Sequence, residues 1–190
     1  MHPQSIPMLS NLFGKKDTTP FTAIFKDKVY LHSAGKITAC LQKAKASPDS
    51  IFIAWFTETA ATFEKFFVHY GMDEKRVMLA EKIDITVLQN YQPVFLEHHP
   101  LNAKELALVT DWQLTGIAVF SAMDEPLFKH FGSDKMMPLI KLLGFKENEA
   151  IEHSYVTESI IKGQNKIAAK VLVEQTANSQ VEWMKKNMEG

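Results

Sequence analysis

The chain has 190 residues, 46% of them hydrophobic and 23% charged, and its formal net charge is −1. This length suits one globular domain with its own core, and the charge favours neither nucleic acid nor anionic lipid as a partner. The single cysteine, Cys40, excludes an internal disulfide, and the start of the chain lacks the basic and apolar regions of a signal peptide. No apolar run approaches the roughly 20 residues of a membrane helix. We therefore expect a cytoplasmic protein without membrane insertion.

Residues 1–20 mix Pro, Ser, Asn, Gly and Thr with little periodicity, which predicts a flexible leader. Four apolar side chains in it could form one amphipathic turn: Met8, Leu9, Leu12 and Phe13. A leader that docks on the rest of the chain is therefore the alternative.

Strand and helix patterns alternate along the next hundred residues. Short apolar runs indicate strands at Phe21–Leu31, with a turn near Lys26–Lys28, and at Ser50–Phe56, Arg76–Glu81, Pro93–Glu97 and Ile117–Phe120. Helical spacing indicates helices at Ser33–Ala46, with Ser33 as a candidate cap, at Thr57–Tyr70 and at Asn102–Thr110. This order predicts a parallel sheet flanked by helices and built from right-handed crossovers.

Two features of these helices favour a packed core over a chemical role. One helical stripe carries four aromatic residues, which is more typical of a core than of a platform that stacks nucleic-acid bases. These residues are Phe63, Phe66, Phe67 and Tyr70. Cys40 also falls on an inward stripe, so we expect it to be buried rather than nucleophilic.

The last third of the chain is predicted to be helical. Apolar residues at helical spacing end at Gly132 and again at Gly144, where left-handed caps are expected. A long helix then carries an apolar stripe of Val156, Ile160, Gly163, Ile167 and Val171. A final helix is expected over Ala177–Lys186, around Trp183. We divide the chain into a leader (1–20), an α/β domain (21–150) and a helical extension (151–190), which folds back, pairs with another chain or stays partly exposed.

Five short groups of residues follow one another in this region: Asp124-Glu125, Phe131-Gly132, Leu143-Gly144, Ile151-Glu152-His153, and Gln164 with Lys166. Their order and spacing resemble the end of the second nucleotide-binding domain of SecA, the preprotein translocase ATPase. Asp27, Tyr30 and Lys36 resemble the start of the same domain. The resemblance implies a reduced RecA-like, P-loop NTPase-like fold, in which a three-layer α/β domain with a parallel sheet is followed by a C-terminal helical extension.

The motifs that hold nucleotide in that family are absent. Phosphoryl transfer needs amides and guanidinium groups around the transferred charge, which the family supplies with a glycine-rich loop and several arginines. This chain has one arginine, Arg76, and its eight glycines are scattered. Gly35-Lys36 does not complete a phosphate loop, since Tyr30 and Ile37 stand where Gly and Ser or Thr are required. We therefore expect no ATP hydrolysis, no catalytic residue and no cofactor.

Glu97, His98 and His99 are the residues most similar to a set of metal ligands. Adjacent histidines on an extended strand point to opposite faces, which favours a hydrated or hydrogen-bonded pair over a metal site. A metal site would need a further ligand from His69, His130 or His153.

The candidate binding surface is the segment that replaces the family's arginines, together with the tryptophan of the last helix. Its residues are Glu97, His98, His99, Lys104, Asp111, Trp112, Gln113 and Trp183.

We expect a catalytically silent SecA-like domain with a protein-binding or accessory role linked to preprotein translocation. Its partner would be the translocation machinery or another copy of the chain. The first alternative is a nucleotide-dependent translocase subunit that completes its ATP site with another chain. The second is a small metal-dependent enzyme that uses Glu97, His98 and His99.

Overall fold

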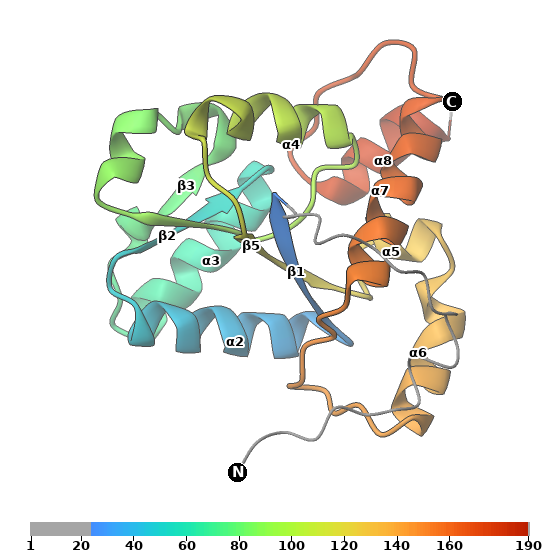
Figure 1. Ribbon diagram of the computed structural model, residues 1–190, viewed down its shortest axis with the longest axis horizontal. Coiled ribbons are helices and arrows are strands. Elements are labelled where there is room, and N and C mark those ends of the chain that lie inside the picture. Colours follow the sequence, from blue (N-terminus) through green and yellow to red (C-terminus); the bar gives the residue numbers. More distant parts are fainter. Residues whose placement is uncertain (1–23, 190) are drawn as a thin grey trace.

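The computed structural model describes residues 24–189, except for the side chain of Asp111. The predicted leader at 1–20, with its possible apolar turn between Met8 and Phe13, lies outside these described residues. Within them the chain forms a five-stranded sheet with helices on both faces, followed by helices that pack against one end of the sheet (Figure 1).

All five strands are parallel and lie in the order β1-β5-β4-β2-β3. Their bounds are Phe25–Tyr30 for β1, Ser50–Ala54 for β2, Val77–Leu79 for β3, Gln92–Phe95 for β4 and Ile117–Ala122 for β5. β2 is buried along its whole length, as its unbroken apolar run predicts for an inner strand of a parallel sheet. The predicted fold class, an α/β domain with a parallel sheet and C-terminal helices, is confirmed.

The α-helices of the described part are α2 (Ser33–Ala46), α3 (Thr57–His69), α4 (Asn102–Val109), α5 (Pro126–His130), α6 (Ser133–Leu142), α7 (Ser154–Ala168) and α8 (Gln180–Met188). Short 3-10 turns lie at Glu74–Arg76, Ala80–Lys82, Ile85–Gln89 and Thr110–Trp112.

Two apolar layers cover the sheet. α2 and α3 cover one face, where Cys40 and Phe67 are fully buried in the same cluster as Phe52. α4 and the turn after it cover the other face, where Trp112 shares a cluster with Ile53. Phe52 and Ile53 serve opposite layers because successive strand residues point to opposite faces. The predicted burial of Cys40 is confirmed.

The aromatic stripe of α3 belongs to the core only as far as Phe67. Phe63 and Phe67 are buried and Phe66 is half-buried, whereas Tyr70 is 49% exposed. α3 ends at His69, so Tyr70 stands beyond the helix. The prediction that Tyr70 belongs to the core is wrong.

The predicted turn near Lys26–Lys28 is also wrong, because β1 runs straight through these residues. Lys26 and Lys28 point outward, while Asp27 points inward with Phe25 and Val29. The cluster of charges suggested a turn, but one of them is buried and paired inside the protein.

Polar side chains account for two further differences from the sequence prediction, one in the cap of α2 and one in the start of the last helix. Ser33 is not the cap of α2; its amide and hydroxyl donate to the Asp124 carboxylate across the fold. The last helix begins at Gln180 rather than Ala177, since the Ser179 hydroxyl accepts the Glu182 amide hydrogen as an N-cap.

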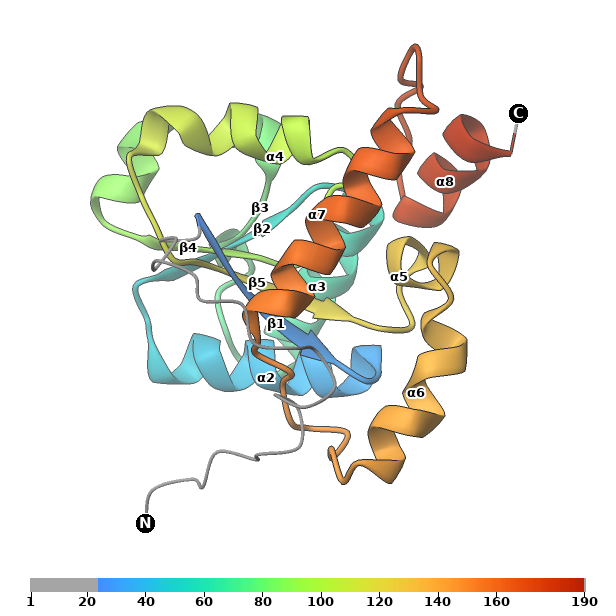
Figure 2. The same cartoon turned by 45° about the vertical axis from the view of Figure 1, so that its right-hand side comes forward.

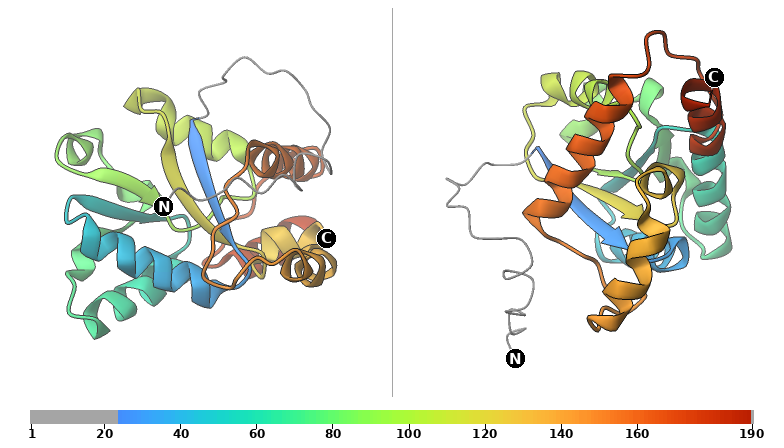
Figure 3. Two further views of the ribbon diagram at one scale, coloured as in Figure 1. Left: turned by 60° about the horizontal axis from the view of Figure 1, so that its bottom comes forward. Right: turned by 90° about the vertical axis from the view of Figure 1, so that its right-hand side faces the viewer.

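The long helix α7 folds back onto the α/β part, where it lies against β1 and α4 (Figures 2 and 3). Ile160, Gly163 and Ile167 of its predicted apolar stripe are buried. α8 then packs on α5 through Trp183 and Met184. Among residues 24–189, no helix combines the length and the apolar character needed to cross a membrane.

Candidate functional site

The strand order reverses between β2 and β4. The chain leaves β2 through α3 toward β3 at one edge, and leaves β4 through α4 toward β5 on the other side. In open parallel sheets ligands bind in the crevice outside the carboxyl ends of the strands at such a reversal. Glu97, His98 and His99 follow β4 after Leu96, so these candidate residues from the sequence lie at this position.

Glu97 is buried and ties the end of β4 to the start of α3. Its carboxylate accepts the amides of Trp55 and Phe56, at 3.2 and 3.3 Å, and the Thr59 hydroxyl at 2.8 Å. Burial raises the pKa of Glu97 to about 7, although the nearby charge of Lys36 opposes this rise. The Glu97 carboxylate therefore has a structural role, since it holds the backbone between β2 and α3.

Lys36, which follows Gly35 on α2, points into the interior. Its ammonium pairs with the Glu125 carboxylate and donates to the carbonyl of Leu96 at 2.6 Å. Burial alone would lower the pKa of Lys36, but the charges of Glu125 and Glu97 outweigh it and the pKa is raised. The lysine is therefore held in an internal ion pair.

His98 lies between two buried carboxylates. Its Nε2 is 2.9 Å from Asp27 Oδ1 and its Nδ1 is 2.9 Å from Glu105 Oε1. Burial alone would lower the pKa of His98, but both carboxylates raise it well above its ordinary value. Each carboxylate accepts a hydrogen, so both ring nitrogens are donors and the imidazole is charged. In this state His98 has no free lone pair for a metal or a substrate proton.

His99 points the other way and is neutral. Its Nδ1 accepts the Leu101 amide hydrogen at 3.0 Å, and its Nε2 lies 3.3 Å from Glu174 Oε1. Burial lowers the pKa of His99, against the raising effect of Glu174. The ring stacks on Phe56 and meets Trp183 edge-on. The two histidines diverge, as the strand geometry predicts, and residues 24–189 contain no group of three or more His, Cys, Asp or Glu placed to hold a metal.

The C-terminal helices fill the crevice. The Gln164 amide on α7 donates to His99 O at 2.8 Å and to Glu105 Oε2 at 2.9 Å. The Gln180 amide on α8 donates to His98 O at 2.9 Å and accepts the Leu127 amide at 2.8 Å. Trp183 is 1% exposed. Both helices are therefore fixed at the crevice by buried hydrogen bonds as well as by apolar contact.

The seven candidate residues whose side chains the structure describes do not form one surface. Glu97, His98, His99 and Trp183 lie inside the filled crevice, and Trp112 lies in the core under α4, stacked on Phe95. Two candidates have exposed or partly exposed side chains. Lys104 pairs with Glu174 at 2.9 Å, and Gln113 occupies a left-handed turn with φ 54°.

The sequence reading missed the partners of the two histidines: Asp27, Glu105, Gln164, Glu174 and Gln180. One signal was available. Asp27 stands two residues from Phe25 and two from Val29, so a strand without a turn would place its carboxylate on the buried face.

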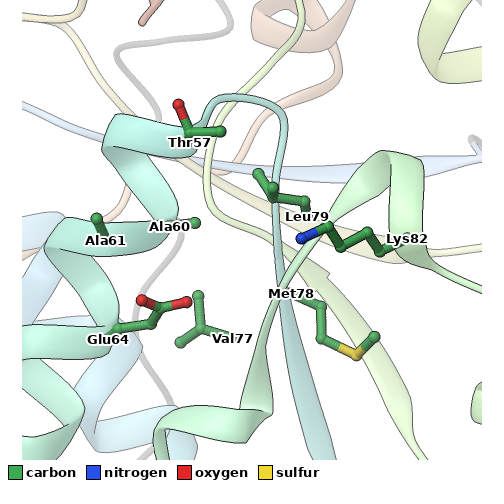
Figure 4. Close-up of a pocket in the computed structure, with 8 residues that line it drawn as sticks. All are labelled: Thr57, Ala60, Ala61, Glu64, Val77, Met78, Leu79 and Lys82. Atoms are coloured by element: carbon green, nitrogen blue, oxygen red, sulfur yellow. The ribbon is translucent and has the colours of Figure 1, made fainter. Parts of the chain in front are cut away.

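A cavity of about 310 Å³ opens between α3 and the edge strand β3. Figure 4 shows Glu64 projecting from α3 toward Val77, and the Lys82 ammonium beside Leu79. The rest of the lining is mainly apolar or small. One carboxylate and one ammonium cancel in charge, so the cavity does not favour phosphate.

The fold and the crevice define an all-parallel α/β protein whose customary ligand position is filled by its own C-terminal helices. No protein-family model matches the chain. Part of it is similar to proteins named protein translocase subunit SecA, with 45% identity over 51 residues in Acidithiobacillus ferrooxidans, 39% over 51 residues in Ehrlichia canis and 40% over 48 residues in Ehrlichia ruminantium. These matches cover 25–27% of this chain, and the matched part spans about 6% of the length of each relative.

Proposed function

We propose that this protein is a catalytically silent SecA-like domain with a protein-binding or accessory role linked to preprotein translocation in the cytoplasm. Two observations support the link to SecA. Part of the chain is similar to SecA proteins, and its parallel sheet with C-terminal helices agrees with the fold that the motif order implies.

The filled crevice is the main observation in support of a catalytically silent domain. A nucleotide bound at the carboxyl ends of β2 and β4 would overlap the position of α7 and α8. Its entry would break the hydrogen bonds of Gln164 and Gln180 and expose Trp183 to water. Such a loss of buried polar and apolar contacts opposes binding.

The position of Arg76 supports the same conclusion. Its guanidinium donates to three backbone carbonyls, those of Ala44, Ser47 and Ser50, at 2.9, 2.8 and 2.9 Å. Ser50 begins β2, so Arg76 lies at the amino edge of the sheet, opposite the crevice. The single guanidinium of the chain thus has a structural role.

Titration calorimetry of the whole protein with ATP and Mg²⁺ tests catalytic silence, with a SecA motor as the positive control. We expect no saturable heat up to about 1 mM nucleotide, which corresponds to binding weaker than about −4 kcal/mol. The same titration with an equimolar mixture of this protein and SecA, compared with SecA alone, tests for a site completed by another chain, because such a site would add bound nucleotide beyond that of SecA alone. Saturable binding to this protein alone would contradict the proposal.

Binding to immobilised SecA tests the accessory role. The exposed candidate Lys104 provides the variant Lys104→Glu, and Lys65, exposed on α3, provides the control Lys65→Glu. We expect the wild type and the control to bind alike, and Lys104→Glu to bind about fivefold more weakly, as expected for a rim charge worth about 1 kcal/mol. If neither the wild type nor the two variants bind, SecA is not the partner.

A further inference from the structure

Residues of α5, α6 and α7 line an apolar groove of about 260 Å³. α5 and α6 lie at the end of the molecule away from β3 (Figures 1 and 2). Apolar side chains line most of the groove, among them Phe131, Met136, Leu139, Leu143 and Val156. We call it the α6 groove. Phe131, Met136 and Leu139 are 40, 51 and 53% exposed, so large apolar side chains meet water here. Such patches mark places where a further apolar element binds.

The lining offers an occupant little polar bonding. The Ser133 hydroxyl donates to the Met123 carbonyl, and the Ser159 hydroxyl donates to the Tyr155 carbonyl. The His153 ring nitrogen accepts the Tyr155 amide hydrogen. These polar groups already have partners inside the protein. An occupant must therefore be held by apolar side chains.

We propose that the leader of this same chain covers the α6 groove, through the apolar side chains between Met8 and Phe13. Met8, Leu9, Leu12 and Phe13 are spaced one, three and one residues apart, which puts them on one face of a helical turn. This face matches the apolar lining, and the leader is the segment of this chain that lies outside the described residues.

The length of the chain allows this contact. Val29 of β1 lines the groove, and the described chain begins at Ile24, at the amino end of the same strand. Five residues of strand span about 17 Å. The eleven residues from Phe13 to Ile24 span up to about 36 Å when extended. The apolar turn can therefore reach the part of the groove lining that includes Val29 with residues to spare.

Docking of the leader in the α6 groove does not depend on the proposed function. A leader bound in the α6 groove shields an apolar face of a binding domain from water. Nucleotide titration and SecA binding test the crevice and the surface near Lys104, whereas hydrogen exchange of the leader tests only the groove. Either proposal can therefore be overturned while the other stands.

Hydrogen exchange of the full-length protein, followed by mass spectrometry of the peptide that covers residues 6–16, tests the contact. The variants are Leu139→Asp, which places a charge in the groove, and Leu142→Asp, its matched control. Leu142 lies on the same helix, is 83% exposed and does not line the groove. In the leader, Leu12→Asp is paired with the control Ser10→Asp.

We expect leader amides in the wild type and in both controls to exchange about tenfold more slowly than in Leu139→Asp and Leu12→Asp, as about 1.4 kcal/mol of docking would produce. Leader exchange as fast in the wild type as in Leu12→Asp would overturn the proposal. Protection that grows with protein concentration would also overturn it, in favour of a second copy as the occupant. Leu12→Asp changes no residue of the described fold, so the test stands even if Leu139→Asp unfolds.

Discussion

His98 Nε2 lies 2.9 Å from Asp27 Oδ1, although the two residues are 71 positions apart in the chain. Glu105 completes the arrangement from the other side of the ring. A buried imidazolium between two carboxylates stabilises the fold only while the imidazole is charged, and this gives a prediction for pH.

We expect His98→Gln to lower the free energy of unfolding by about 3 kcal/mol at pH 6, because it leaves two buried carboxylates without their cation. The pKa of His98 is raised in the folded protein, so its contribution is complete below the unfolded value of about 6.5 and is lost as pH rises through the folded pKa. Urea unfolding from pH 6 to pH 9 should show the wild type approaching the variant as pH rises.

The control for this series is His69→Gln at the exposed end of α3, which should change stability by less than about 0.5 kcal/mol. A difference between wild type and His98→Gln that grows with pH would show that His98 is neutral when folded.

Glu97→Gln should remove a second pH dependence of stability. Here the protonated group that the fold favours is a neutral carboxyl, whereas in His98 it is a charged imidazole. The pKa of Glu97 is raised to about 7, so ionising it in the folded protein is unfavourable. The protonated Glu97 side chain contributes about 3 kcal/mol to the free energy of unfolding at pH values below its unfolded pKa. This contribution is lost as the pH rises through the folded pKa of about 7. We expect the wild type to lose stability relative to Glu97→Gln between about pH 5 and pH 8.

Thermal unfolding across that pH range measures the effect of Glu97. Glu58→Gln, an exposed carboxyl in the first turn of α3, is the control and should follow the wild type. Parallel curves for wild type and Glu97→Gln would contradict a raised pKa.

Trp183→Ala should destabilise the protein by about 3–5 kcal/mol, because it leaves a cavity where α8 fills the crevice. It also removes the indole hydrogen bond to Glu174, at 2.9 Å. Val181→Ala, 65% exposed on the same helix, should cost less than about 0.5 kcal/mol. Urea midpoints compare the two, and equal midpoints would show that α8 contributes little to the fold.

Arg76→Lys should cost about 1–3 kcal/mol, because an ammonium cannot reproduce the planar donors that meet the three carbonyls. Lys75→Ala in the same turn should be close to neutral, since Lys75 is exposed. Chemical unfolding measures both variants. An unchanged midpoint for Arg76→Lys would leave this arginine without the structural role assigned to it.

Sequence reasoning was most successful where one element's own pattern carries the information. The nearly unbroken apolar run at Ser50–Phe56 predicted an inner strand, which the structure forms over Ser50–Ala54. The helical spacing of Ile160, Gly163 and Ile167 predicted the buried face of α7. It failed at Asp27 and Tyr70. Charged residues usually favour a turn and aromatic residues usually favour the core, but the position of each of these residues in the fold decides otherwise. Asp27, inside β1, is buried because it pairs with His98. Tyr70 follows the last residue of α3 and lies outside the apolar core.

By itself, the sequence determined the alternation of strands and helices, and with it the parallel α/β fold, because periodic apolar spacing acts locally along the chain. The tertiary structure alone decided which polar groups meet. Asp27, Glu105 and Gln164 surround His98 and His99 from separate elements, and their pairing is fixed by how the helices close over the sheet. Buried charges require partners, but those partners come from distant parts of the chain, and no local spacing records them.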